Sequence, residues 1–236
     1  MRYALLPCRS GVSEPVSPCT LPEIAKTGAN SVRLFWFARM GIAIGEAEAS
    51  IATAVDKGML PILELHDSTC AWELDGLVRY WTSPEAVQLI QKYQSNLIIN
   101  IANETGPPSA EEFRTKYSEV VQTMRAAGIH VPRMIDGRNC GRDAELLLAQ
   151  GPALLEADPD HNLIFSAHLY DRMAPGGYGQ LFDAARAKKL TLVIGEFANR
   201  GEHVLVRQPA RLGQGSGAHA AGQHQEYVRA ADVAAR

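Results

Sequence analysis

The sequence predicts an α/β protein with the (β/α)8 barrel fold. Short apolar segments alternate with helix-like segments along most of the 236 residues. The apolar segments are hydrophobic almost throughout, which is typical of parallel strands that are buried on both faces. At least six of these strand-and-helix units follow one another, and such a long series favours a barrel over an open sheet.

The expected strands are runs of β-branched and other apolar residues, bounded by turn-forming residues. Their ranges are Ser31 to Phe37, Met59 to Leu65, Leu97 to Ile101, Arg133 to Asp136, Leu163 to Ala167 and Leu190 to Ile194. In a complete barrel these segments would be strands two to seven.

The expected helices alternate with the strands, and several carry recognisable end signals. Ser83, Pro84 and Glu85 provide an N-cap, a first-turn proline and an acidic first-turn residue. Gly58 and Gly128 stand just past two of the helices, where glycine commonly ends a helix. The expected ranges are Gly45 to Lys57, Ser83 to Tyr93, Ser109 to Ala127, Asp143 to Ala157 and Gly179 to Lys188.

We expect a single catalytic domain over residues 1–236, with a divergent tail over residues 203–236. A barrel of this class typically needs about 250 residues, so the chain is near the lower limit. His203 to Arg207 could form a strand and Gln225 to Arg236 a helix. Pro209 to Gln225 is rich in Gly, Ala and Gln, a composition typical of a loop. The barrel is therefore expected to be incomplete at strand eight and at the N-terminus.

Charge and composition argue against several classes of function. The net charge is −3 and the pI about 6.2, without the basic patch that nucleic-acid binding requires. No apolar run reaches the length of about 18 residues that a membrane span needs. The apolar run after Met1 is too short for a signal peptide.

The four cysteines are Cys8, Cys19, Cys70 and Cys140. They form no CxxC pattern and have no histidine at ligand spacing, which argues against a zinc site. One disulfide is compatible with the sequence, but the spacing does not decide its partners. Neither a metal nor an organic cofactor is expected.

Polar residues follow the expected strands at the end where barrel enzymes place their chemistry. Trp36 is an aromatic residue at one of these strand ends and could contact a substrate. The polar candidates are Arg33, His66, Asn103, Glu104, His168, Tyr170 and Glu196. Structural roles are the alternative, because Arg33 could form an ion pair inside the barrel and the two histidines could be satisfied core residues.

Glu104 and Glu196 are the best pair of carboxylates among these candidates. Cleavage of a glycoside with retention needs two carboxyl groups about 5 Å apart, one as acid/base and one as nucleophile. The fourth and seventh strands of a barrel face each other, so the two side chains could flank one bond. Asn103 could bind the sugar 2-hydroxyl, and Arg33 could keep Glu196 ionised. His168 and Tyr170 could hold the nucleophile.

Five segments resemble the strand motifs of glycoside hydrolase family 5 in clan A, especially those of bacterial cellulases and β-mannanases. The segments are GANSVRLFW, PILELHD, IINIANE, FSAHLY and VIGEF, and the resemblance covers roughly Leu21 to Asn199. It implies that Glu104 is the acid/base and Glu196 the nucleophile. It further implies that a subsite at the scissile bond is lined by Arg33, His66, Asn103, His168 and Tyr170.

The chain departs from the family pattern in three places, as truncation or a frameshift at both ends would produce. No tryptophan follows Trp81, so the sugar-stacking tryptophan of strand eight is absent. Asn139-Cys140-Gly141 stands where the family often has Asn-Trp-Gly. The residues up to Pro18 do not resemble the family's first strand.

These observations lead to the expectation of an endo-acting retaining hydrolase of β-1,4-linked glycans such as cellulose, glucomannan or mannan. An inactive or carbohydrate-binding remnant of such a barrel is the main alternative, and a barrel enzyme with another substrate is a third. The sequence does not choose between glucan and mannan. The resemblance implies an extracellular protein, and a second copy could cover an unpaired strand edge.

Overall fold

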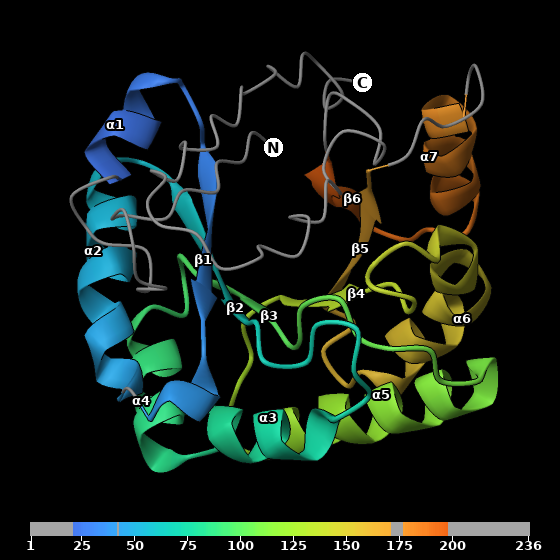
Figure 1. Cartoon of the computed structure of the whole chain (residues 1–236), viewed down its shortest axis with the longest axis horizontal. Helices are drawn as coiled ribbons and strands as arrows, with labels where there is room; N and C mark the ends of the chain where they lie inside the picture. Colours follow the sequence, from blue (N-terminus) through green and yellow to red (C-terminus); the bar gives the residue numbers. More distant parts are fainter. Residues whose placement is uncertain (1–20, 42, 171–176, 198–236) are drawn as a thin grey trace, which may run out of the picture.

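Six parallel strands form one curved sheet in the order β1-β2-β3-β4-β5-β6 (Figure 1). The computed structural model describes residues 21–41, 43–170 and 177–197. The strands are β1 (Ser31–Trp36), β2 (Leu60–Leu65), β3 (Ile98–Asn100), β4 (Arg133–Asp136), β5 (Leu163–Leu169) and β6 (Leu192–Phe197). They are the six predicted strands, so the described part of the chain is an incomplete β/α barrel. We call this sheet and its helices the half-barrel.

The helices lie around the convex side of the sheet (Figure 1). They are α1 (Leu21–Lys26), α2 (Glu48–Asp56), α3 (Leu74–Trp81), α4 (Pro84–Lys92), α5 (Ala110–Ala126), α6 (Ala144–Ala157) and α7 (Gly177–Ala187). Two short 3-10 helices, Ala38–Met40 and Ile44–Ala47, precede α2. Among the described residues, no helix combines the length and apolar character that crossing a bilayer requires.

Local sequence signals account for the starts of two helices. The Ser83 hydroxyl accepts a hydrogen bond from the Ala86 backbone, as the predicted N-cap requires. Ser109 and Glu112 cap α5 reciprocally, each side chain bonding the other's backbone N–H. The prediction omitted α1 and α3, although α3 presents an apolar face through Leu74, Leu77 and Trp81.

Side chains of each strand alternate between two different environments. Val32, Leu34 and Trp36 point outward into the main hydrophobic core between the sheet and the helices. On the inner side, Ile62, Ile98 and Met134 form a small apolar cluster. Further along the strands the inner positions become polar, and there the predicted site residues lie. The half-barrel therefore has an apolar floor beneath a polar layer.

The opposite end of the half-barrel holds a separate buried ion-pair cluster. Arg125 of α5 contacts Asp158 through Nε at 2.7 Å and Nη2 at 2.8 Å. Arg133 of β4 contacts the same carboxylate at 3.0 Å. These ion pairs connect α5, β4 and the turn before β5, so they stabilise the fold away from the polar layer.

Several predicted boundaries differ from the structure. The last strand ends at Phe197 instead of Ile194, and the strand before it continues to Leu169 instead of Ala167. The residues by which these two strands exceed the prediction include the site residues His168 and Glu196. The expected strand at residues 203–207, the helix at 225–236 and the first strand lie outside the described residues.

Candidate active site

Seven of the eight predicted site residues converge at the carboxyl ends of the strands. Direct contacts or short chains of contacts connect them, with Arg33 and His168 at the centre. The group consists of Arg33, His66, Asn103, Glu104, His168, Tyr170 and Glu196. The sequence prediction that these residues share one site therefore agrees with their positions.

Trp36 is not part of this group. Its side chain is buried in the main core, and its indole Nε1 donates a hydrogen bond of 2.7 Å to the Tyr80 hydroxyl. The reason is strand alternation, because Trp36 stands three positions after the inward-facing Arg33, and side chains an odd number of positions apart point to opposite faces of a sheet. A side chain on the outer face of β1 points at the helices and away from the polar layer.

Glu104 and Glu196 approach each other across the polar layer. A carboxylate oxygen of each lies within 4.8 Å of the other and of His168. This spacing is compatible with the approximately 5 to 5.5 Å typical of retaining glycosidases, and shorter than the roughly 6.5 Å or more of inverting ones. The pair can therefore place an acid and a nucleophile on one glycosidic bond.

A β-bulge directs Glu196 into the site. Ala167 of β5 pairs with Ile194 of β6, and the next residue, His168, pairs with Glu196. Gly195 is thus the extra residue on β6, and it shifts the alternation of the strand by one position. Without the bulge, Glu196 would face the helices.

Gly195 also leaves space that a side chain would fill. A Cβ at this position would lie 2.1 Å from Ser166 Oγ, 2.9 Å from His168 Nε2 and 3.0 Å from Arg33 Nη1. The backbone of β6 consequently lies directly against the groups beneath the two carboxylates. Only glycine permits this approach.

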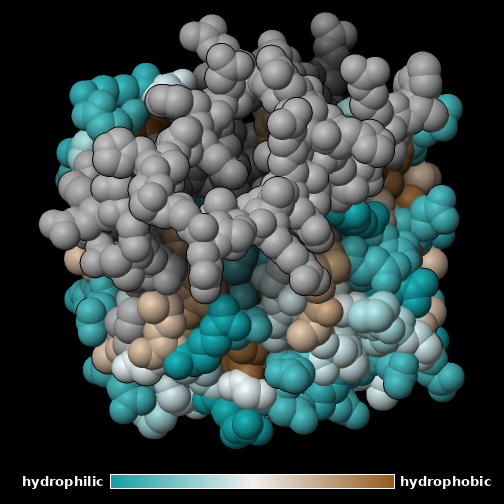
Figure 2. All heavy atoms as spheres, viewed as in Figure 1, coloured by the Kyte–Doolittle hydropathy of each residue, from teal (hydrophilic) through white to brown (hydrophobic). Residues whose placement is uncertain are grey.

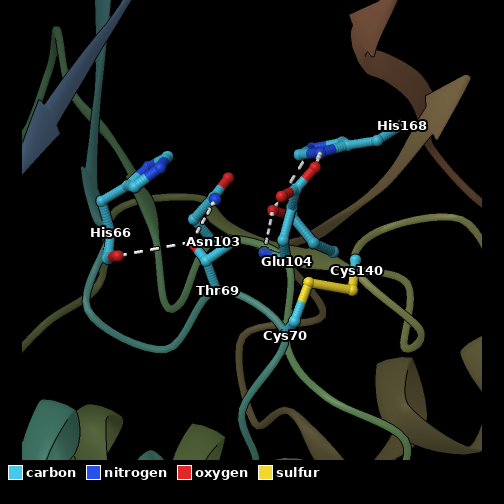
Figure 3. The surroundings of a disulfide bond; sticks show 8 residues. His66, Thr69, Cys70, Asn103, Glu104, Cys140 and His168 are labelled. Carbon is cyan, nitrogen blue, oxygen red and sulfur yellow. Dashed lines mark hydrogen bonds and ion pairs between the residues drawn. A yellow bond between two sulfur atoms is a disulfide. The ribbon is translucent and has the colours of Figure 1, made fainter. Parts of the chain in front are cut away.

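Glu104 follows β3 with its backbone in the left-handed region, at φ 48°. Its amide N–H donates to Asp136 Oδ2 at 3.2 Å, and its carbonyl accepts from the Cys70 amide at 2.6 Å. Both contacts hold a conformation that is uncommon for a residue with a side chain. The Glu104 carboxylate then meets His168 Nδ1 at 2.9 Å (Figure 3).

A disulfide between Cys70 and Cys140 joins the loops after β2 and β4 (Figure 3). The loop that carries Glu104 lies between them. Cys140 donates its amide to Thr105, and Gly106 donates its amide to Ala71, so backbone hydrogen bonds join the same three loops. Cys140, which follows Asn139 in the departure from the family pattern noted above, is thus one partner of this disulfide.

Arg33 is fully buried and reaches four acceptors. It forms a salt bridge through Nε with Glu64, and Nη2 donates to Asn103 Oδ1 at 2.7 Å and to Asp136 Oδ2 at 3.1 Å. Arg33 Nη2 lies 3.8 Å from Glu196 Oε1, the distance of an ion pair and too long for a hydrogen bond. Burial opposes the charge, but the surrounding carboxylates raise the pKa of Arg33 above its ordinary value.

The electrostatics of Glu196 are set by opposing effects. Burial raises the pKa of this carboxyl, while the cations of His168 and Arg33 oppose the shift. The Tyr170 hydroxyl donates a short hydrogen bond to Glu196 Oε2 and stabilises its ionised form. Burial and the neighbouring anions raise the pKa of Tyr170, so its hydroxyl stays a donor.

Two buried acidic residues of the site were missed by the sequence analysis. Glu64 of β2 contacts both Arg33 and His66, the latter at 2.7 Å to Nδ1. Asp136 ends β4 and contacts Arg33, His168 and the Glu104 amide. Glu64 interrupts an apolar strand and Asp136 stands at a strand end, so both carried a signal in the sequence.

Glu104, His168 and Glu196 are also the group in the described part of the chain that is close enough to hold a metal ion. The histidine contacts argue for a different role. Carboxylates face both of its ring nitrogens, at 2.9 Å to Nδ1 and 3.3 Å to Nε2. These contacts favour protons on both nitrogens, and an imidazole that is protonated on both nitrogens cannot coordinate a metal.

One face of the molecule is drawn in Figure 2. Figure 2 shows mostly hydrophilic residues over the coloured part of this face, with only small hydrophobic areas. The large apolar side chains that are exposed among the described residues are Met40, Tyr178 and Phe197. Phe197 follows Glu196 in β6, so its side chain points to the opposite face of the strand.

Comparison with characterised sequences identifies relatives that are named as mannanases. The chain is 31% identical over 191 residues to a mannan endo-1,4-beta-mannosidase of Cellvibrio japonicus, covering 75% of this chain and 44% of the relative. A mannan endo-1,4-beta-mannosidase of Salipaludibacillus agaradhaerens is 31% identical over 193 residues, covering 76% and 61% respectively. The chain thus spans about half the length of these two relatives.

Solved structures show the same fold. A beta-mannanase of Streptomyces thermolilacinus superposes with a TM-score of 0.71 at 29% identity, over 76% of this chain and 64% of that one. The same enzyme with mannohexaose superposes equally well, at 28% identity over 77% and 63%. The family model for the cellulases matches residues 19–214, most of the chain. The chain therefore belongs to the cellulase family, glycosyl hydrolase family 5.

Proposed function

We propose that this protein is an endo-acting retaining hydrolase of β-1,4-linked glycans, with Glu104 as acid/base and Glu196 as nucleophile. The observation that carries the proposal is the approach of the two carboxylates to within 4.8 Å. That distance leaves room for one sugar carbon between them but not for an additional water molecule. Family membership and the activities in the relatives' names support the same reaction.

The reaction proceeds in two displacements. Protonated Glu104 gives its proton to the leaving glycosidic oxygen while a Glu196 oxygen attacks the anomeric carbon, forming a glycosyl ester. Glu104, now a carboxylate, takes a proton from water. The water oxygen attacks the same carbon, and Glu196 leaves as a free carboxylate. Both inversions at the anomeric carbon together give retention.

The neighbouring residues prepare these steps. Tyr170 and Arg33 stabilise the charge on Glu196, and Asn103 is available to bind the sugar 2-hydroxyl. Arg33 fixes the Asn103 carbonyl oxygen, so the amide nitrogen points toward the Thr69 hydroxyl, at 3.0 Å (Figure 3). His66 is one-third exposed beside Asn103 and can contact the sugar.

Mannan is the substrate that we propose within this class. The relatives with the best coverage are named as mannan endo-1,4-beta-mannosidases, and a similar structure holds mannohexaose. We expect faster hydrolysis of soluble galactomannan or glucomannan than of carboxymethyl cellulose. Equal or higher rates on the cellulose derivative would contradict the assignment to mannan.

Substitution of the two carboxylates tests the mechanism. Glu104→Gln and Glu196→Gln each remove one role, and each should lower kcat on soluble mannan by at least about 10²- to 10⁴-fold. Reducing-sugar release measures the rate. Glu156→Gln, an exposed glutamate of α6, is the matched control and should retain the parental rate. Mass spectrometry with a 2-fluoro glycoside should find the trapped sugar on Glu196.

A carbohydrate-binding remnant without turnover is the second candidate. The observation that favours it is the absence of any tryptophan after Trp81, where a sugar-stacking ring would be expected. Affinity electrophoresis in mannan gels would then show retardation, while parent and Glu196→Gln proteins would release equal, background amounts of reducing sugar.

We also propose that the protein works outside the cell and forms a homo-oligomer. A disulfide beside the site and a polymeric substrate support the extracellular location. The end strands of the described sheet, β1 and β6, support self-association, because a second copy could cover a strand edge. A single monomeric species by light scattering would refute the homo-oligomer.

A further inference from the structure

Asp136 occupies the centre of the polar layer, beneath both candidate catalytic carboxylates. It ends β4, and its side chain is completely buried. Its Oδ1 accepts a hydrogen bond from Asn100 Nδ2 at 2.8 Å. Its Oδ2 lies 3.1 Å from Arg33 Nη2, 3.2 Å from the Glu104 amide nitrogen and 3.3 Å from His168 Nε2.

These four donors come from different parts of the half-barrel. Arg33 belongs to β1, Asn100 to β3, Glu104 to the loop after β3, and His168 to β5. One carboxylate therefore sets the relative positions of the acid/base backbone and two cations.

The contacts of the two ring nitrogens of His168 favour one of its protonation states. Nδ1 lies 2.9 Å from a Glu104 oxygen and 3.6 Å from a Glu196 oxygen, so it donates toward the catalytic pair. Nε2 lies 3.3 Å from Asp136 Oδ2 and 3.3 Å from Arg33 Nη1. The Arg33 guanidinium can only donate hydrogen bonds. Nε2 of a neutral His168 ring would therefore accept one from Arg33, whereas Nε2 of a charged ring would donate one to Asp136. The anions on both sides favour the charged ring.

We propose that Asp136 is a positioning residue of the hydrolytic site: its carboxylate fixes the Glu104 backbone and holds a protonated His168 between the two catalytic carboxylates. This role rests on the function proposed above. A cation at this point lies 2.9 Å from Glu104 and 3.6 Å from Glu196, so it can offset negative charge on either carboxylate as the charge of the pair changes during the two displacements. Asp136 balances that cation throughout both displacements.

The charged groups around His168 agree with this assignment. Arg33 from β1 disfavours the cation, whereas Asp136 from β4, Glu104 from the loop after β3 and Glu196 from β6 favour it. Further titratable groups that interact with Asp136 or the catalytic pair are Glu64, His66, Tyr117 and Tyr170. Burial lowers the pKa of His168, but the carboxylates, Asp136 foremost, raise it to about 10.

Nuclear magnetic resonance of the histidine rings tests the proposal directly. In the parent protein, the ¹⁵N shifts of His168 should stay those of an imidazolium at pH 8, where exposed histidines are neutral. Comparison with His168→Gln assigns the signal. In Asp136→Asn, which keeps the shape and removes the charge, His168 should be neutral at pH 8. This readout needs no substrate, so it is independent of whether the protein hydrolyses mannan.

Kinetics supply the second readout. Asp136→Asn should lower kcat on soluble mannan by about 100-fold, the effect of a small misplacement of the acid/base, while KM changes little. The kcat/KM profile should gain an ionisation near neutral pH. If Asp136 had only a structural role, Asp136→Asn would lower the free energy of unfolding without changing the pH profile of kcat/KM.

Asp158→Asn is the matched control, because Asp158 is equally buried and also bridges two basic side chains, at the far end of the half-barrel. It should lose stability but keep the charged His168, kcat and the pH profile. A neutral His168 in the parent at pH 8, or a charged ring and parental kcat in Asp136→Asn, would overturn the proposal. If Asp136→Asn does not fold, the titration of the parent alone decides it.

Discussion

Tyr170 illustrates how one side chain tunes the site at the residue scale. Its hydroxyl donates to Glu196 from the end of β5, and this hydrogen bond favours the carboxylate over the carboxylic acid. Burial acts in the opposite direction on the same group. The nucleophile therefore depends on Tyr170, Arg33 and His168 together to stay ionised.

Tyr170→Phe should move the acid limb of the kcat/KM profile to higher pH. Loss of the hydroxyl raises the pKa of Glu196 further, so less of the nucleophile is ionised at low pH, and the rate falls there first. The profile on soluble mannan between pH 4 and 8 measures the shift. Tyr93→Phe, whose hydroxyl contacts Glu48 at the surface, is the control and should leave the profile unchanged. If the acid limb of the Tyr170→Phe profile stayed in place, the role of Tyr170 in stabilising ionised Glu196 would be contradicted.

The sequence predicted most of the site because strand ends are visible as polar residues after apolar runs. Glu104 and Glu196 were found in this way, whereas Asp67, which follows β2, braces a loop by accepting from the Ala38 and Arg39 amides. Asp136 was missed because its importance lies in contacts from three other elements, which no local pattern reveals.

At the scale of the elements, the loops after β2, β3 and β4 act as one unit. The Cys70–Cys140 disulfide connects the outer two, and Glu104 occupies the middle one. His168 donates its amide to the Gly141 carbonyl, so the same unit reaches β5. The sequence left the cysteine pairing open, since the partners are 70 residues apart and only the fold brings them together.

Removal of this disulfide should destabilise the protein and slow catalysis. A link across 70 residues restricts the unfolded chain by about 4 kcal/mol in the chain-entropy model. Urea unfolding of Cys70→Ser/Cys140→Ser should show a loss of this size, and kcat should fall because Glu104 is less firmly held. The Cys70→Ser/Cys140→Ser variant and the protein with which it is compared should both also carry Cys8→Ser and Cys19→Ser. In that background, reductant should destabilise only the protein that keeps the pair, and equal sensitivity of both would refute the prediction.

Element boundaries show where sequence patterns fail. The β-bulge at Gly195 extends β6 past its apolar run, and apolar content alone ended the predicted strand at Ile194. The helix α3 was omitted although Leu74, Leu77 and Trp81 have helical spacing, since Gly76 and the preceding cysteine loop obscured it. Bulges depend on pairing with a neighbouring strand, which a single segment does not encode.

For the whole molecule, buried ion pairs at both ends of the half-barrel couple stability to pH. Burial opposes ionisation of Glu64, Asp136 and Asp158, but their cationic partners hold the pKa of each carboxyl below its ordinary value. A lowered folded-state pKa contributes stability that is present above the unfolded value, near 4, and is lost as the pH falls.

The free energy of unfolding should therefore decrease steadily from about pH 5 to pH 2. Urea denaturation followed by tryptophan fluorescence at several pH values measures the slope. Asp158→Asn removes one of the three groups and should make the slope shallower, as well as lowering stability at pH 7. An unchanged slope in this variant would show that Asp158 titrates alike in folded and unfolded chains.

The close contact of Gly195 with the groups below the two carboxylates restricts which substitutions this protein can accept. A single added carbon there would collide with Ser166, His168 and Arg33. New sugar preferences cannot arise by reshaping the base of the cleft without displacing the reacting groups. New sugar preferences must instead arise from changes in the loops that follow the strands, because atoms added on the solvent side of the site displace water and do not collide with protein.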